Sequence, residues 1–95
     1  HKRGICPVVD DEQHLLGVVT TGDLNRLLEV KKDFFDIPVS RVMNPTPKTC
    51  RADDLAVLAY QKMEKYKIIA MPVLEDGRLV GVVHLHDLMQ QGIAR

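Results

Sequence analysis

The 95-residue chain is long enough for one small domain, or for two half-sized units that share a core. Apolar residues make up 45% of it and charged residues 27%, which is ordinary for a globular protein. Thirteen basic and thirteen acidic side chains give a net charge of zero, which argues against a nucleic acid or a membrane surface as partner. No apolar run approaches the ~20 residues that cross a bilayer, and we expect a cytoplasmic protein.

The first predicted elements are two strands and a helix. Ile5–Val9 and Leu15–Val19 are continuous apolar runs, which are typical of strands covered on both faces, and the polar turn Asp10–His14 separates them. The helix that follows is indicated by leucines at helical spacing and by cations near its end, where they suit the helix dipole: Leu24, Leu27, Leu28, Lys31 and Lys32.

A linker and a longer helix come next. The stretch 33–50, DFFDIPVSRVMNPTPKTC, contains three prolines and predicts a linker that ends in a short extended piece at Lys48–Cys50. Ala52–Lys67 then reads as an amphipathic helix with Asp53 and Asp54 in its first turn. One apolar stripe of this helix is expected to lie in the core: Leu55, Leu58, Ala59, Met63 and Tyr66.

The last third predicts a second pair of strands and a short helix. Ile69–Leu74 and Leu79–Val83 flank a turn that contains Asp76-Gly77, a strong hairpin signal because glycine accepts a positive φ. Leu88 and Met89 open the predicted helix, and Gly92 is a plausible stop.

The two strand pairs are copies of one another. Pro7 falls on Pro72 with an offset of 65 residues, and Gly17 falls on Gly81 with an offset of 64. Asp23-Leu24 likewise falls on Asp87-Leu88. The repeat predicts two related units, with the second half of the first in residues 1–36 and a complete second in residues 37–95.

The first unit lacks the strand and helix that open the second. Without them, four residues of its strands should present apolar surface to water: Ile5, Val9, Leu16 and Val18. Because the chain starts HKRG with no initiating Met, we expect a trimmed chain, or a missing half that is disordered or replaced by a neighbouring molecule.

Cys6 and Cys50 are the only cysteines, and each has apolar neighbours. Two separated cysteines do not form a disulfide framework. Two buried, reduced thiols are therefore expected in preference to a bridge.

Thr20-x-x-Asp23 supports two interpretations. It is close to a capping box, with Thr20 at the N-cap and Asp23 at the third helical position. The same helix N-terminus would also suit a phosphate, with the Thr20 hydroxyl donating to it and Asp23 accepting from ribose hydroxyls.

His84-x-His86 takes the place of the threonine in the second copy. Two histidines on one side of an extended segment would suit a metal, but no third ligand lies near in sequence, and we expect no metal. A protonated His84 would instead meet an anionic ligand, with Asp87 in a ribose-binding position. A hydrogen-bonded His84 at a strand end is the simplest alternative.

The repeated pattern, with its strand-helix-strand-strand-helix order and its Pro and Gly-x-x-Thr-x-x-Asp spacing, resembles the CBS domain. This resemblance implies an α+β (mixed α/β) fold of tandem CBS domains. Such pairs commonly bind adenine nucleotides or related ligands in the cleft between the copies. GVVTTGDLNR (Gly17–Arg26) and GVVHLHDLMQQGI (Gly81–Ile93) further resemble the CBS pair of KpsF/GutQ-type arabinose 5-phosphate isomerases.

In that family an isomerase domain interconverts D-arabinose 5-phosphate and D-ribulose 5-phosphate for Kdo synthesis, in lipopolysaccharide or capsule formation. The resemblance therefore implies a regulatory, non-enzymatic module with no required cofactor and no catalytic residue, which binds an adenine nucleotide or CMP-Kdo. The implied ligand-binding residues are Thr20, Asp23, Ile5, Pro7, Lys48, Thr49, Ile69, Ala70, Pro72, His84 and Asp87.

The resemblance also implies a homodimer formed through the second helices, in a parent protein that is compatible with a tetramer. The apolar residues expected at that interface are Leu24, Leu28, Met89 and Ile93. A purely structural dimerisation module that binds no ligand is the alternative function.

Overall fold

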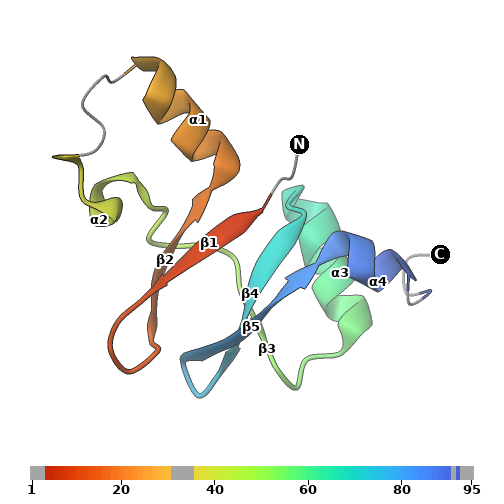
Figure 1. The fold of residues 1–95 in the computed structure, drawn as a ribbon. Helices are drawn as coiled ribbons and strands as arrows, with labels where there is room; N and C mark the ends of the chain where they lie inside the picture. The colour runs from red at the N-terminus through yellow and green to blue at the C-terminus, as the bar shows by residue number, and fades with distance from the viewer. Residues whose placement is uncertain (1–3, 31–35, 91, 93–95) are drawn as a thin grey trace. The chain divides into compact units, whose positions relative to one another are not determined.

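The computed structural model describes residues 4–30, 36–90 and 92. Two compact units divide between Pro47 and Lys48, and each is described by itself (Figure 1). These units are defined by contacts between residues, whereas the predicted boundary after residue 36 was defined by the sequence repeat. That boundary therefore stays a prediction.

The first unit is a two-stranded antiparallel sheet with two helices. Strands β1 (Ile5–Val9) and β2 (Leu15–Thr20) pair, and helices α1 (Thr21–Val30) and α2 (Val39–Val42) follow (Figure 1). Both predicted strands and the first predicted helix are confirmed, whereas Lys31 and Lys32 lie outside the described residues. The one-turn helix α2 was not predicted. It forms within the proline-rich stretch because Pro38, with φ −62°, stands at its N-cap, where a backbone N–H is not needed.

Residues Met43 and Asn44, here called the strap, lie along the outer edge of β2. The Val18 N–H donates to the Asn44 carbonyl at 3.0 Å, and the Asn44 N–H donates to the Val18 carbonyl at 2.7 Å. A Cβ on Gly17 would lie 2.6 Å from the Asn44 carbonyl oxygen, so this approach requires glycine. Val18 is only 5% exposed, so its predicted exposure was wrong, and its backbone pairs with Asn44 of the strap.

The outcome for the other three residues of the predicted apolar surface is mixed. Leu16 is exposed, as predicted, while Ile5 and Val9 are half-buried.

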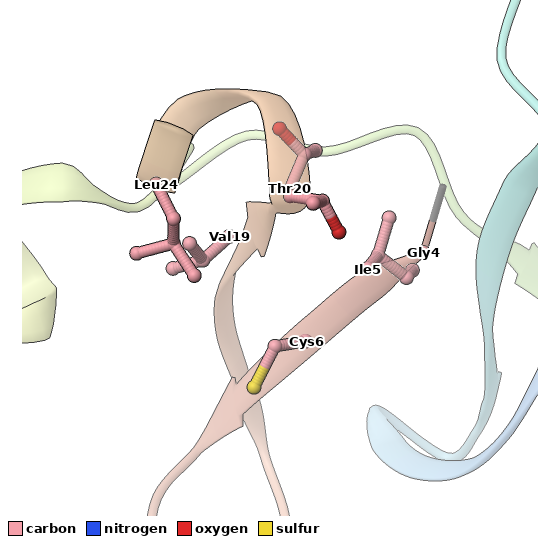
Figure 2. Close-up of a pocket in the computed structure, with 7 residues that line it drawn as sticks. Gly4, Ile5, Cys6, Val19, Thr20 and Leu24 are labelled. Atoms are coloured by element: carbon pink, nitrogen blue, oxygen red, sulfur yellow. The ribbon is translucent and has the colours of Figure 1, made fainter. Parts of the chain in front are cut away.

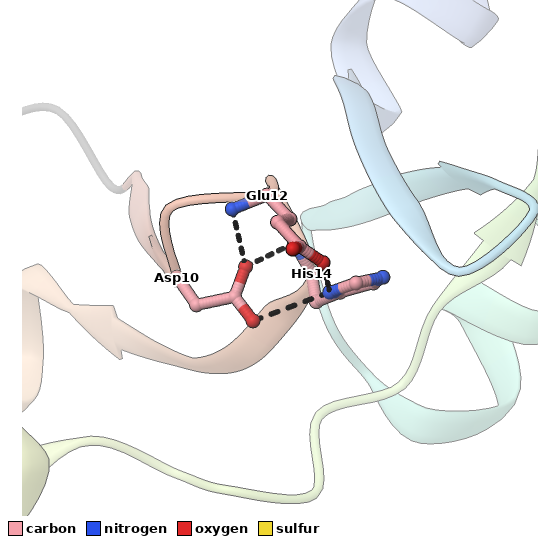
Figure 3. A network of polar contacts seen from close by, with 3 residues as sticks. All are labelled: Asp10, Glu12 and His14. Atoms are coloured by element: carbon pink, nitrogen blue, oxygen red, sulfur yellow. Dashed lines mark hydrogen bonds and ion pairs between the residues drawn. The ribbon is translucent and has the colours of Figure 1, made fainter.

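The turn between β1 and β2 is organised by Asp10 (Figure 3). Its Oδ1 accepts the backbone N–H groups of Glu12 and His14 at 2.8 and 2.9 Å, and its Oδ2 lies 3.2 Å from His14 Nδ1. The hydrogen bond from the His14 backbone is the main cause that lowers the pKa of Asp10. The turn is therefore favoured while Asp10 is ionised, and this contribution is lost as the pH falls through the lowered pKa.

The second unit has the complete strand-helix-strand-strand-helix order. Its elements are β3 (Cys50–Arg51), α3 (Ala56–Tyr66), β4 (Ala70–Glu75), β5 (Arg78–His84) and α4 (Leu85–Gln90). The sheet order is β3-β4-β5, with β3 parallel to β4 and β4 antiparallel to β5. The predicted turn is confirmed, since Asp76 and Gly77 have φ values of 54° and 80°.

Helix α3 is shorter than predicted. An Asp54 carboxylate oxygen accepts the Arg51 N–H at 2.8 Å, which folds this segment into a turn and delays the helix to Ala56. Only part of the predicted stripe is core: Ala59 and Met63 are buried, whereas Leu55 and Leu58 are 66% and 53% exposed. The last stripe residue, Tyr66, is also exposed.

The core of the second unit lies between α3, α4 and the sheet. Its buried cluster consists of Cys50, Ala59, Met63, Met71 and Leu88. Helix α4 starts at Leu85, three residues before the predicted start. The chain leaves the helix near Gly92, whose φ of 80° suits the predicted stop. No helix among the described residues has the length and apolar character needed to cross a membrane.

The two thiols should differ strongly in reactivity. Both are free, but Cys6 is exposed, so its predicted burial was wrong, while the burial of Cys50 is confirmed. Burial raises the pKa of the Cys50 thiol, which further disfavours the reactive thiolate. Under native conditions we expect iodoacetamide to alkylate Cys6 on the order of tenfold faster than Cys50, or more. Peptide mapping by mass spectrometry would measure both rates, and equal rates would contradict this packing.

Candidate ligand-binding site

A hollow of about 200 Å³ lies in the first unit where β1, β2 and α1 meet (Figure 2). Its lining residues are Gly4, Ile5, Cys6, Val19, Thr20, Thr21 and Leu24. The lining is largely apolar, and its polar groups gather where β2 becomes α1. Two predicted ligand residues, Ile5 and Thr20, line the hollow and are direct cross-strand partners.

The start of α1 is fixed by a reciprocal capping box. The Asp23 N–H donates to Thr20 Oγ1 at 3.1 Å, and the Thr20 N–H donates to Asp23 Oδ2 at 3.3 Å. The Thr21 N–H donates to the Gly4 carbonyl at 3.3 Å. The predicted cap is therefore confirmed. Gly22 is exposed in the first turn of α1, where a helix has backbone N–H groups without intrahelical acceptors.

Asp23 is also paired with a cation that the sequence reasoning missed. An Arg26 guanidinium nitrogen donates to Asp23 Oδ1. The two residues stand at i and i+3 of one helix, a spacing that favours such a pair. Because most of the Arg26 side chain is exposed, its remaining N–H groups stay available to an anion.

The second unit repeats the backbone arrangement of this region. Ala70 pairs with His84 as Ile5 pairs with Thr20, and the Leu85 N–H donates to the Ile69 carbonyl at 2.8 Å. This hydrogen bond corresponds to the one from the Thr21 N–H to the Gly4 carbonyl in the first unit. The repeat therefore extends from sequence to hydrogen bonding.

Burial differs between the two copies. Met71 and Leu88 are buried in the core with α3, whereas their counterparts, Cys6 and Leu24, are exposed. The inner wall of the hollow thus corresponds to a face that α3 covers in the second unit.

The edge of the hollow behaves differently from its inner wall. We call this edge, formed by Gly4, Ile5 and Thr20, the rim. The counterparts of Gly4 and Thr20 are Ile69 and His84, and both are exposed although α3 is present, whereas Ala70, the counterpart of Ile5, is buried. Two of the three rim positions are therefore accessible in the second unit, where α3 is present.

The remaining predicted ligand residues lie elsewhere in their units. Pro7 is half-buried and Pro72 and Ala70 are buried, all within strands. The Lys48 ammonium lies over the Tyr66 ring, 4.3 Å from its centroid. The Thr49 carbonyl accepts a hydrogen bond from Lys62 Nζ at 2.7 Å. These contacts give Lys48 and Thr49 structural roles, and their part in binding stays a prediction.

The predicted geometry of the two histidines was wrong. His84 ends β5, but His86 lies in the first turn of α4, so they do not share an extended segment. Both are exposed, as is Asp87. Within the described ranges, no three His, Cys, Asp or Glu side chains are grouped so as to hold a metal ion.

The sequence profile of the CBS domain matches residues 1–30 and 39–92, which is most of the chain. The chain belongs to the CBS domain family. As the profile matches both repeats, this CBS chain is a pair, and its α+β fold is as predicted.

Its curated relatives include arabinose 5-phosphate isomerases. The CBS chain is 44% identical over 91 residues to arabinose 5-phosphate isomerase GutQ of Salmonella typhi, and 38% identical over 91 residues to arabinose 5-phosphate isomerase KdsD of Pseudomonas aeruginosa. These alignments cover 95% of the chain but only 28% of each relative. The chain thus spans little more than a quarter of their length.

Solved structures of CBS proteins share the fold. The CBS domain pair of protein MJ0100, in complex with 5'-methylthioadenosine and S-adenosyl-L-methionine, matches with a TM-score of 0.79 and 28% identity, over 93% of this chain and 68% of that one. CBSX2 in complex with AMP matches with a TM-score of 0.78 and 28% identity, over 94% of this chain and 70% of that one. All the ligands named for these two proteins contain adenosine.

Proposed function

We propose that this CBS pair is the regulatory, ligand-binding part of an isomerase that interconverts D-arabinose 5-phosphate and D-ribulose 5-phosphate. Its ligand is an adenine nucleotide or a sugar nucleotide such as CMP-Kdo, and it binds at the rim of the hollow. The observation that carries the proposal is the open rim beside the capped start of α1. The isomerase activity is proposed from the names of the curated relatives, and the adenine preference from the ligands of the related structures.

The rim offers the two kinds of surface that a nucleotide needs. Ile5 gives an apolar contact for a base, and the Gly4 backbone supplies groups that a purine edge can recognise. The Gly22 N–H and the Arg26 guanidinium supply donors for a phosphate. Asp23 Oδ1, which also accepts from Arg26, accepts from ribose hydroxyls, while Oδ2 serves the cap. Binding of one ligand by both repeats remains a prediction from the family resemblance.

Regulation would follow from differential binding. A ligand that contacts one conformation of the CBS pair better than another shifts their populations. A coupling free energy of about 1–3 kcal/mol to the isomerase part would change its substrate affinity by roughly 5–150-fold.

A thermal-shift panel tests ligand binding. The panel contains nucleotides of adenine, cytosine and uracil, together with CMP-Kdo, each near millimolar concentration. A ligand at a hundred times its Kd stabilises the protein by ~2.7 kcal/mol. For a domain of this size that is a rise of roughly 10–20 °C in Tm. We expect at least one member to raise the Tm.

Variants of Asp23 separate its binding role from its capping role. Asp23→Ala removes both and should lower the Tm of the free protein as well as abolish the ligand shift. Asp23→Glu keeps a carboxylate at the third helical position, where Glu completes a capping box. It should keep the free-protein Tm and lose most of the ligand shift. Asp76→Asn is the matched control and should leave the shift unchanged. A full shift in Asp23→Glu would count against a ligand at this rim.

A structural role is the second candidate function. Leu24 and Leu28 on α1 are 39% and 54% exposed, and Met89 on α4 is 54% exposed, while Ile93 lies outside the described residues. Exposed apolar residues of this kind fit a homodimer interface. If the whole panel leaves the Tm unchanged and sedimentation shows a dimer, the structural role is supported in place of the sensor.

A further inference from the structure

The four methionines of the chain differ in how far solvent reaches them. Met63 and Met71 are 0% exposed in the core of the second unit, and Met89 is 54% exposed on α4. Met43 of the strap is half-buried. Of the four, Met43 alone is intermediate in exposure, so part of its surface is open to a small solute while the rest packs against the protein.

The contact that Met43 makes is with Gly17 of β2. A Cβ built on Gly17 would lie 2.8 Å from the Met43 Sδ and 3.0 Å from the Met43 Cγ, so the thioether fills the space over this glycine. An unbranched, polarisable thioether suits a narrow gap of this kind. The next residue, Asn44, exchanges two backbone hydrogen bonds with Val18. One side-chain contact and two hydrogen bonds therefore hold the strap at adjacent positions of β2.

One oxygen added to the Met43 sulfur would disturb this arrangement. Oxidation to the sulfoxide makes the side chain polar and enlarges it at the atom that lies over Gly17. The Val18 N–H already donates to the Asn44 carbonyl. A sulfoxide oxygen left without a donor is costly to bury, so it competes for that N–H or turns toward water. Either outcome loosens the strap.

We propose that Met43 makes the strap sensitive to oxidation, and that its conversion to the sulfoxide releases the strap from β2. The oxidant is hydrogen peroxide. The S–O bond forms as the O–O bond breaks, and the proton of the transferred hydroxyl passes to the leaving hydroxide, which departs as water. The sulfur loses two electrons and the peroxide gains them. Methionine sulfoxide reductases reverse the change.

Release of the strap alters the connection between the two units. Residues 45–47 join the strap to the second unit, which starts at Lys48. A released strap therefore adds its two residues to the segment that joins the units. A redox change of this kind acts as a switch when it biases such a structural element. The inference is independent of the proposed nucleotide site, and its test needs no nucleotide.

Hydrogen exchange after peroxide treatment tests the proposal. The ¹⁵N-labelled full chain is treated with hydrogen peroxide, and peptide mapping by mass spectrometry follows the oxidation of each methionine. We expect Met43 to be oxidised well before the two core methionines. Exchange of the Val18 and Asn44 amides should then be on the order of tenfold faster, or more, because both amides donate in the strap. Methionine sulfoxide reductases specific for the two epimers should together restore the original rates.

Met43→Leu is the matched control. Leucine conserves the volume and has no sulfur, so the variant should fold, keep slow exchange at Val18 and not respond to peroxide. It retains both thiols and the other methionines, so equal acceleration in this variant would assign the effect to them and overturn the proposal. Unchanged exchange in a chain whose Met43 is fully oxidised would also overturn it, as would oxidation of Met43 no faster than that of the core methionines.

Met43→Gln provides a second variant that needs no oxidant. Its amide places a polar group over Gly17, as the sulfoxide does. Exchange of the Val18 and Asn44 amides should be fast in this variant without peroxide. Exchange as slow as in the untreated chain would contradict the proposed mechanism, because a polar group at this position would then be compatible with an attached strap.

Discussion

Met63→Ala is expected to lower the free energy of unfolding of the second unit by about 2–5 kcal/mol. The Met63 side chain is 0% exposed and packs with Met71, Leu88 and Cys50 between α3 and the sheet. Truncation to alanine loses its buried apolar surface and leaves a cavity that this small core can only partly close. Urea denaturation with a fixed m-value would measure the change.

Met89→Ala is the matched control for this substitution. Met89 also lies on a helix but is 54% exposed, so its truncation should change stability by less than about 0.5 kcal/mol. If Met63→Ala leaves no folded protein to measure, Met63→Leu, which conserves volume, should cost less than about 1.5 kcal/mol. Equal effects at Met63 and Met89 would contradict the described core.

Gly17→Val is expected to destabilise the first unit by about 1–3 kcal/mol and to detach the strap. Its Cβ would meet the Asn44 carbonyl oxygen at 2.6 Å, a backbone atom that can move only if the strap moves. The two hydrogen bonds between Val18 and Asn44 would then be lost. Hydrogen exchange of the Val18 and Asn44 amides should accelerate in the variant, and thermal unfolding should report the loss of stability.

Gly81→Val provides the comparison for Gly17→Val. It introduces the same side chain at the equivalent position of the other repeat, where no described atom interferes. Because valine also favours strands, the variant should be neutral or slightly stabilising. Equal destabilisation at Gly17 and Gly81 would show that strand geometry, and not the strap, requires glycine at Gly17.

The repeated strands were predictable because the sequence marks both ends of each one. Proline and glycine recur in both copies at nearly the same spacing, and the strands β1 and β4 fall where the apolar runs predict them. The capping box was predictable for the same reason, since Thr20 and Asp23 interact across three residues of one helix start. Local interactions of this kind are encoded within a short stretch of sequence.

The features that were missed have two kinds of cause, contacts between distant segments and a local turn that replaces part of a helix. Val18 was predicted to be exposed but is buried, and its backbone pairs with Asn44, which lies 26 positions further along the chain. No local pattern near Val18 indicates this contact. Leu55 and Leu58 were assigned to the core from their helical spacing, but Leu55 precedes the helix and both side chains are exposed. The missed start of α3 has a local cause, the turn that Asp54 closes with Arg51. That turn competes with the helix for the same residues.

For the candidate site, the sequence indicated two of the residues that line the hollow, Ile5 and Thr20, but not the others. Cys6 and Leu24 were assigned to core and interface, yet both line the hollow. Their exposure depends on what covers the inner face of the first unit, which is a tertiary property. Arg26 was missed although its spacing from Asp23 was visible in the sequence.

An NMR titration of the ¹⁵N-labelled chain with AMP tests the proposed nucleotide site most directly. If an adenylate binds at the rim, we expect saturable shifts centred on the amides of Gly4–Cys6 and Val19–Leu24. The shift of the Gly22 amide should be among the largest. Unchanged spectra with AMP and with CMP-Kdo at millimolar concentration, or shifts that leave Thr20, Gly22 and Asp23 unaffected, would contradict binding there.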